Sequence, residues 1–291
     1  MTLREAFTNP WGKPRALRII TLAYILWSML PVAVAILFSF NSGRSRSTWQ
    51  GFSLRWYLHD AASVARDDSL RLALFQSIRL AVLTMLVATP LGVALAIGLA
   101  RWRGRGARPA NFLMLVPLVT PEIVMGVALF LVFSNLYDFV PFGTWAQFLG
   151  HVTFSISFVV IIVRGRLFAI GRDYEEAAMD LGASPREAMW RVLIPLLAPA
   201  IFSSFAIVFA ISIDDFVISQ FLSADASSIT IPVRLYAGIR QAPPPSLNAL
   251  ATIMLLTTTA AVLIAAQVMR RYGRREGQPD SAVAALGRLD I

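Results

Sequence analysis

Residues 76–100 read QSIRLAVLTMLVATPLGVALAIGLA, and residues 101–108 continue with RWRGRGAR. The first stretch carries one charged residue, Arg79, over a length that lets a helix cross a hydrocarbon core about 30 Å thick. Four arginines follow directly. An apolar run of this length that ends in a basic cluster is typical of a membrane helix whose basic end stays in the cytoplasm. The stretch therefore predicts an integral membrane protein.

The composition of the whole chain agrees with this prediction. Its 291 residues are 57% hydrophobic and 15% charged, and the mean hydropathy is +0.65. The chain has no cysteine, which excludes disulfides and thiolate metal sites. A net charge of +9 could indicate a nucleic-acid partner, but the basic residues lie in short clusters between apolar runs, as in proteins that the bilayer orients. We therefore expect a lipid bilayer and no nucleic acid.

The same length criterion applied along the chain predicts an all-α membrane protein with six transmembrane helices. The apolar stretches lie near residues 17–40, 76–100, 112–133, 145–163, 196–213 and 247–269. The first is too long for a signal-peptide core and lacks a small-residue cleavage site, so we interpret it as a retained anchor. A transmembrane domain would then cover 17–269, with a terminal segment at 1–16 and a polar tail at 270–291 that is predicted to be disordered.

The basic residues also predict the orientation of the spans. Of the 26 arginines and lysines, 18 fall in the N-terminal segment, the second and fourth connections and the C-terminal segment, whereas 7 fall in the other three connections. Because cytoplasmic loops are enriched in basic residues, both termini are expected in the cytoplasm.

The fourth connection, residues 164–195, is too long to be a simple turn. Asp173 and Ser184 each stand three residues before a glutamate, which is the pattern of a helix N-cap. Gly182 lies between the two helices that these caps predict, and Pro185 would take the first position of the second helix. We expect a helix-turn-helix knuckle. Helix pattern alone leaves open whether it folds back on its own bundle or docks a partner.

The residues of this knuckle resemble a family motif. Glu176-Ala177-Ala178, then Gly182, then Val192-Leu193-Ile194-Pro195 are similar to the E-A-A-x3-G-x9-I-x-L-P pattern of permeases from bacterial binding-protein-dependent ABC importers. Val192 and Ile194 depart from that pattern by changes that conserve volume. The resemblance implies the type I ABC importer permease fold.

The resemblance also implies the partners of the chain. In that family the knuckle is the coupling element, which sits in a cleft of a cytoplasmic ATPase, and the contact would fall on Glu175, Glu176, Ala177, Ala178 and Gly182. The expected assembly holds a dimer of ATP-binding subunits, a second permease that is typically a different chain, and an extracytoplasmic solute-binding protein, all at the bacterial inner membrane. ATP and Mg would be bound by the partner, because this chain has no G-x-x-x-x-G-K-S/T loop and no cofactor of its own is expected.

Further segments are similar to the spermidine/putrescine branch of these permeases. They are SIDDFVIS at 212–219, Ile231-Pro232, Leu235-Tyr236 and NALAT at 248–252. The resemblance implies a polyamine cargo. Related branches that carry other small solutes share parts of these segments, so another solute stays an alternative.

Glu122 is the first candidate for the substrate pathway. It is the eleventh residue of the stretch 112–133, which would place it near the middle of a straight span. A carboxylate there costs about 2.5 to 3.5 kcal/mol on insertion scales, so it should face a cavity or a partner. Pro117 and Pro121 would open the backbone beside it. Pairing with a donor inside the bundle is the alternative.

Asp214 and Asp215 are the second candidates and fall at the outer end of the fifth predicted span. Two adjacent carboxylates could attract the ammonium groups of a polyamine or form an outer gate. A solvated helix end would explain them equally well.

No residues indicate catalysis or metal binding. His59 and His151 are the two histidines, and neither has a second ligand at metal-binding spacing. The chain has no H-E-x-x-H and no G-x-S-x-G, so we predict no catalytic residue and no metal site. A secondary transporter that needs no ATP would also place acids in its spans, but it has no use for the knuckle.

Overall fold

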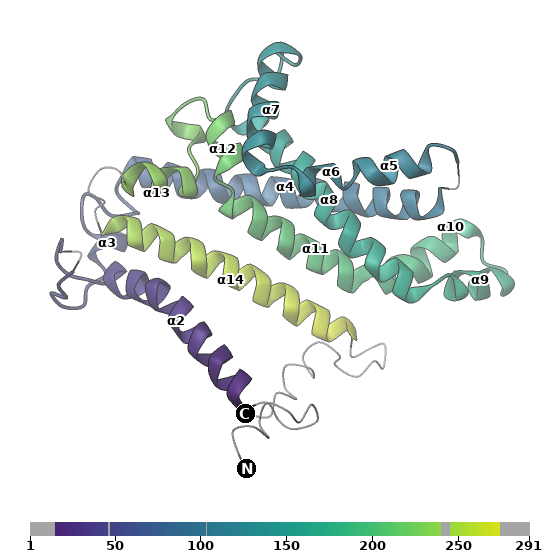
Figure 1. The fold of residues 1–291 in the computed structure, drawn as a ribbon, viewed down its shortest axis with the longest axis horizontal. Coiled ribbons are helices and arrows are strands. Elements are labelled where there is room, and N and C mark those ends of the chain that lie inside the picture. The colour runs from purple at the N-terminus through teal and green to yellow at the C-terminus, as the bar shows by residue number, and fades with distance from the viewer. Residues whose placement is uncertain (1–14, 46, 103, 240–244, 274–291) are drawn as a thin grey trace.

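The computed structural model describes residues 15–45, 47–102, 104–239 and 245–273, and these are nearly all helical. Five long helices run along the molecule (Figure 1). They are α2 (Arg15–Ser39), α4 (Asp68–Arg101), α8 (Thr144–Ile170), α11 (Ile194–Asp214) and α14 (Ser246–Gly273). The predicted segment 1–16 lies almost wholly outside the described residues, and so does the predicted tail beyond Gly273.

Shorter helices connect the long ones. They are α3 (Arg55–Leu58), α5 (Ala107–Leu113), α6 (Val116–Val119), α7 (Glu122–Asn135), α9 (Asp173–Asp180), α10 (Pro185–Ala188), the π-helical turn η1 (Met189–Leu193), α12 (Val217–Leu222), the 3₁₀ turn η2 (Ala226–Ser228) and α13 (Ile231–Ile239).

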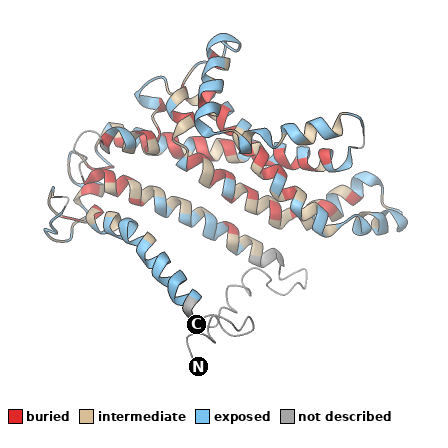
Figure 2. Cartoon of the chain, in the orientation of Figure 1, coloured by how far each residue is buried: buried red, intermediate tan, exposed pale blue. Residues whose placement is uncertain are grey.

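The centre of the bundle is the packing of α4, α8 and α11, whose buried alanines, valines and leucines form one cluster. Gly92 lets α4 approach α8 closely, because a Cβ at this position would lie 2.5 Å from the Cβ of Val159. Helix α14 flanks α11, and α2 packs against α14. Figure 2 shows α2 as almost entirely exposed, which is expected of an apolar helix that faces lipid or another subunit.

The predicted spans are present as five long apolar helices and one bent pair. The bent pair is the third predicted span, which runs from Ala107 to Asn135 with a break of 109° before Glu122. Pro121 stands at this break, as its lack of a backbone N–H leads one to expect. The sequence predicts Glu122 near the middle of a straight span. This prediction is wrong, because the span bends directly before Glu122.

Helices α7 and α12 pack side by side and rise together from the bundle (Figure 1). Gly126 of α7 faces Val217 and Phe221, and a Cβ there would lie 2.7 Å from the Phe221 ring. Further along, Phe133 of α7 shares a buried cluster with Leu222 of α12. Helix α12 is thus packed against α7 along its length.

Candidate functional site

The knuckle is built from local backbone preferences. Ser184 caps α10 in a reciprocal pair with Glu187: the Ser184 Oγ accepts the Glu187 N–H, and the Glu187 carboxylate accepts the Ser184 N–H at 3.0 Å. Gly182 has φ of +93°, a conformation that costs glycine little, and it joins α9 to α10. The predicted helix-turn-helix with its second cap is confirmed.

The first predicted cap is wrong. Arg172 occupies the N-cap position of α9 and makes no capping bond with its side chain, whereas Asp173 is already the first residue of the helix. Asp173, Glu175 and Glu176 lie together in the first turn, where carboxylates interact favourably with the positive end of the helix dipole. The charge distribution stabilises this helix start in place of a hydrogen-bonded cap.

The surface of the knuckle carries large exposed apolar side chains. The exposed fraction is 90% for Leu181 and 58% for Tyr174, and Glu176, Ala177 and Gly182 are exposed beside them. An apolar patch rimmed by polar groups is typical of a surface that meets a partner.

Glu175 differs from its neighbours because its side chain turns toward the bundle. It forms an ion pair with Arg101, the last residue of α4, and 16% of the Glu175 side chain is exposed. A pocket of about 260 Å³ lies at this contact, lined by Arg101, Arg172, Glu175, Glu176, Met179 and Pro185. Glu175 thus ties the knuckle to α4.

The second helix of the knuckle is continuous with a long helix of the bundle. Helices α10, η1 and α11 together run without a break from Pro185 to Asp214, over 30 residues. At 1.5 Å per residue this is about 45 Å. Leu193 and Leu197 bury the start of α11 in the central cluster. The knuckle and Asp214 therefore stand at the two ends of one continuous helix.

The two adjacent aspartates at the far end of α11 lie in opposite environments. Asp214 is exposed, and within the described part of the chain no group donates a hydrogen bond to its carboxylate. The Asp215 side chain is 8% exposed. Its Oδ2 accepts the Ser219 N–H at 2.8 Å and lies 3.2 Å from Nε2 of His151. The sequence predicted one pair of similar acids, whereas the structure separates them.

His151 is a polar residue of this site that the sequence reasoning missed. It lies in the first third of α8 (Thr144–Ile170) and is 2% exposed. Its Nδ1 is 2.7 Å from the Ser212 hydroxyl, and its Nε2 is 3.1 Å from the Ser219 hydroxyl. The available signal was a titratable residue inside an apolar span, which is rare and usually functional.

A second buried network lies one turn earlier on α8. Gln147 Oε1 accepts a hydrogen bond from Gln76 Nε2 at 2.8 Å, and Gln147 Nε2 donates to the backbone carbonyls of Ser219 and Ser228. Together with His151, this glutamine fastens α12 and η2 to α8.

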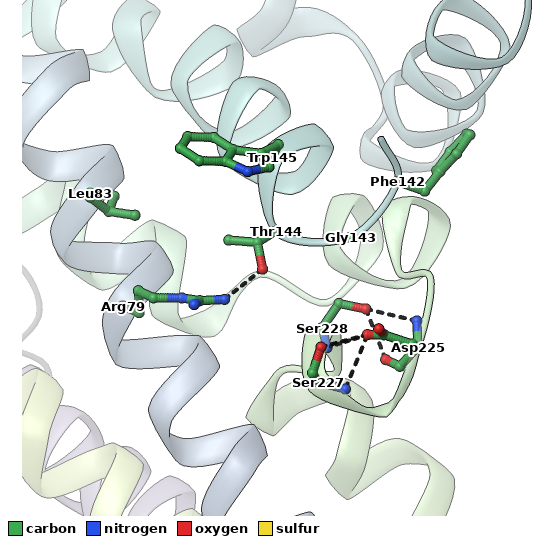
Figure 3. A pocket seen from close by; sticks show the side chains of 9 residues that line it. All are labelled: Arg79, Leu83, Phe142, Gly143, Thr144, Trp145, Asp225, Ser227 and Ser228. Carbon is green, nitrogen blue, oxygen red and sulfur yellow. Dashed lines mark hydrogen bonds between the residues drawn. The ribbon is translucent and has the colours of Figure 1, made fainter. Parts of the chain in front are cut away.

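A pocket opens at this end of the bundle, between α4, α8 and η2 (Figure 3). Its volume is about 430 Å³. Arg79 lies on one wall and donates to the Thr144 hydroxyl at 2.6 Å. Asp225 lies on another, where hydrogen bonds from the Ser227 hydroxyl and from the Ser227 and Ser228 backbone lower the pKa of its carboxyl, so it is charged at neutral pH. The sequence did not single out this pocket.

Glu122 is the first residue of α7 and is exposed. Glu122 therefore stands at the start of α7 and the Asp214–Asp215 pair stands just before α12, and these two helices pack against each other. Nowhere in the described ranges does an ion pair or hydrogen bond link Glu122 to either aspartate. Nor do three His, Asp or Glu side chains of these ranges gather where they could hold a metal ion.

The fold defines a class of protein. A chain of the crystal structure of a bacterial ABC transporter that imports the acidic polysaccharide alginate matches it with a TM-score of 0.69 and 15% identity, over 88% of this chain and 95% of that one. The same transporter in complex with its alginate pentasaccharide-bound periplasmic protein matches with a TM-score of 0.68, over 88% and 93%. The fold is that of the membrane subunits of ABC importers.

The sequence comparisons show the family. The family described as "Binding-protein-dependent transport system inner membrane component" matches residues 88–276, more than half of the chain, and this chain belongs to it. The putrescine transport system permease protein PotI of Escherichia coli K12 is 34% identical over 83% of this chain and 86% of its own length. The spermidine/putrescine permease protein PotC of the same strain is 34% identical over 83% and 89%.

The family also includes a relative with a different cargo in its name. The molybdenum transport system permease protein ModB of Mycobacterium bovis is 31% identical over 88% of this chain and 94% of its own length. The chain is therefore an inner-membrane permease of a binding-protein-dependent system, and the predicted fold and family are confirmed.

Proposed function

We propose that this chain is a permease subunit of an ATP-driven polyamine importer, in which it forms half of the route through the membrane. The observation that carries the proposal is the helix Pro185–Asp214, which bears an exposed knuckle at one end and an exposed carboxylate at the other. The names of the 34% identical relatives, which transport putrescine and spermidine, support the cargo.

In this proposal the knuckle end faces the cytoplasm, as the distribution of arginines favours. A dimer of ATP-binding subunits, which hold ATP and Mg, takes the knuckle into a cleft. Of the predicted contact residues Glu175, Glu176, Ala177, Ala178 and Gly182, Glu175 holds the knuckle against α4 and the other four meet the ATPase, with apolar area added by the exposed Leu181 and Tyr174. Closure of the ATPase on ATP then moves the knuckle, and the continuous helix transmits that motion to the carboxylate end.

The route itself is proposed to pass the starts of α7 and α12. Exposed carboxylates at Glu122 and Asp214 would attract the ammonium groups of a polyamine, and Asp215 lies next to them. A second permease, a different chain, would supply the other half, and a solute-binding protein would deliver the cargo at the end opposite the knuckle. The exposed apolar side chains of α5, α6 and α7 support such a second subunit, because Phe112, Val119 and Ile123 have no cover within the described residues.

Two alternatives give different results in transport assays. The relative named for molybdenum favours another small solute as cargo, and an ATP-independent carrier would need no ATPase. The test is uptake of labelled putrescine and spermidine by vesicles that contain this chain with its partner subunits, with and without internal ATP. We expect ATP-dependent uptake that excess spermidine suppresses and molybdate does not. Suppression by molybdate alone would assign another cargo, and uptake without nucleotide would overturn the importer mechanism.

A further inference from the structure

Asp214 and Asp215 are neighbours in the sequence, yet one carboxylate is exposed and the other is almost fully buried. The burial of Asp215 requires an explanation, because an ionised carboxylate away from water is strongly unfavourable unless a partner compensates it. The backbone N–H of Ser219 supplies one hydrogen bond, at the start of α12. The second partner comes from another helix, and it is the imidazole of His151.

His151 is placed to hold this carboxylate from α8. Its Nε2 lies 3.2 Å from Asp215 Oδ2 and its Nδ1 lies 2.7 Å from the Ser212 hydroxyl of α11. One imidazole therefore contacts both the last turn of α11, at Ser212, and the first residue of the break, Asp215. Gln147, one turn away on the same face of α8, bonds the Ser219 and Ser228 carbonyls but not Asp215. The two α8 residues thus share the packing of α12, whereas the carboxylate depends on His151.

We propose that His151 is a positioning residue: it holds the Asp215 carboxylate inside the bundle, keeps the break between α11 and α12 closed, and leaves Asp214 as the carboxylate offered to cargo. The part that concerns cargo rests on the proposed function. The part that concerns the break rests on the contacts of His151 alone.

The consequence for a cationic cargo is a defined spacing of charges. With Asp215 turned inward, the exposed carboxylates of the proposed route are Asp214 at the end of α11 and Glu122 at the start of α7, on separate helices. A polyamine has ammonium groups separated by methylene chains, so separate carboxylates match it better than two that are adjacent. Release of Asp215 would place two negative charges side by side and change that match.

The first experiment measures the break directly. The chain contains no cysteine, so a single introduced cysteine is the only site in this chain that a thiol reagent labels, and labelling is read on this chain after the subunits are separated. Ile218→Cys reports the buried face of α12, and Gln220→Cys reports its exposed face as the reference. In the assembled complex in lipid nanodiscs, His151→Ala should raise the rate of maleimide labelling at position 218 by about tenfold, because local opening exposes it.

Two further variants separate the contact between His151 and Asp215 from general packing. His151→Gln keeps an N–H donor toward Asp215 and should restore most of the protection. Combining His151→Ala with Asp215→Asn removes the charge that needs a partner, so protection should return toward the parent value. His59→Ala removes an exposed imidazole elsewhere and should leave labelling unchanged. If His151→Ala labels no faster than the parent, or if both variants label as fast as His151→Ala, the positioning role is overturned.

The second experiment concerns cargo and uses labelled putrescine. Asp214→Asn should raise KM for uptake by about tenfold, equivalent to one charged contact, and by more than Asp215→Asn does. His151→Ala should change KM as well as the maximal rate, which a purely structural loss of folded complex would not do. A larger KM effect for Asp215→Asn than for Asp214→Asn would overturn the assignment of the exposed carboxylate. Absence of putrescine uptake by the parent complex would reject the polyamine proposal, whereas the labelling result would still decide the role of His151.

Discussion

The two ends of the helix Pro185–Asp214 are constructed in different ways. At the knuckle, short helices are held by a local cap, a glycine turn and one ion pair to α4, and the apolar side chains are left exposed. At the other end, the break between α11 and α12 is fastened by buried hydrogen bonds between α8 and these two helices, and by the bond from the Ser219 N–H to Asp215. The comparison indicates a division of work in which one end is shaped for a partner to hold and the other keeps charges in fixed places.

The difference also has an energetic side. Substitutions on an exposed surface usually change the free energy of unfolding by no more than about 0.5 kcal/mol, whereas a buried polar group left without its partner costs about 1 to 3 kcal/mol. We therefore expect changes in the knuckle to alter coupling with little loss of stability. Changes at the break between α11 and α12 should alter both transport and stability. The following variants test that contrast, from the largest expected effect to the smallest.

Gly182→Leu should have the largest effect, namely a loss of coupling. The left-handed backbone at Gly182 disfavours a side chain, and the added leucine would lie in the proposed ATPase contact. We expect ATP-driven uptake to fall by more than about tenfold, through uncoupled hydrolysis or lost binding of the ATPase. The measurement is uptake and ATP hydrolysis in the same vesicles.

Gly171→Leu is the matched control for that variant. Gly171 also has a left-handed backbone, with φ of +74°, and a Cβ there would meet nothing within 4 Å, but it lies outside the proposed contact. If both variants uncouple equally, backbone strain explains the result. If neither does, the knuckle is not the coupling element.

Glu122→Gln tests the other end of the comparison and should lower uptake of putrescine by about tenfold, since one charged contact is worth about that factor. Assembly with the partner subunits should be preserved, because Glu122 is exposed and has no ion pair within the described residues. Asp138→Asn, in an exposed loop, is the control for a lost carboxylate. Unchanged uptake would remove Glu122 from the route.

Gln147→Leu should lower the stability of the complex more than its rate of transport. The leucine fills a similar volume but leaves the Ser228 carbonyl and the Gln76 amide without their partner, at about 1 to 3 kcal/mol, while the Ser219 carbonyl keeps the hydrogen bond from the Ser223 hydroxyl. Thermal unfolding of the purified complex, followed by intrinsic fluorescence, should show a lower midpoint. Gln220→Leu, on the exposed face of α12, should not shift it. Equal midpoints for the two variants would mean that the network does not stabilise this end.

The same contrast explains which parts of the structure the sequence could predict. The knuckle was predictable because Ser184, Gly182 and Pro185 specify their conformation within a few residues. The exception, Asp173, failed because charges in the first turn can start a helix without a cap. The apolar runs were predictable for the same reason, since span length is a local property.

The end of the bundle at Asp214 and Asp215 could not be predicted from local sequence. The partners of Asp215 are Ser219, nearby in the sequence, and His151 on another helix, and nothing local links the latter to it. The break of the third span was anticipated from Pro121, but its angle, and therefore the place of Glu122, depends on the packing of α7 against α12. Polar residues inside spans, such as His151 and Gln147, were the remaining signal.

Ser184→Ala should have the smallest effect and is the finest probe of the comparison. Loss of an N-cap costs about 1 kcal/mol, and here the loss is confined to α10, because among the described residues the Ser184 hydroxyl forms hydrogen bonds only with Glu187. Hydrogen exchange at the amides of residues 186–188 should become about fivefold faster, with KM for cargo unchanged. Ser184→Asp keeps a capping oxygen and should restore protection. If Ser184→Ala uncouples as strongly as Gly182→Leu, the rigidity of α10 governs coupling. If coupling survives while exchange accelerates, the contact surface governs coupling. In that case the ATPase needs only to bind the continuous helix, and the first turn of the helix does not need to be rigid.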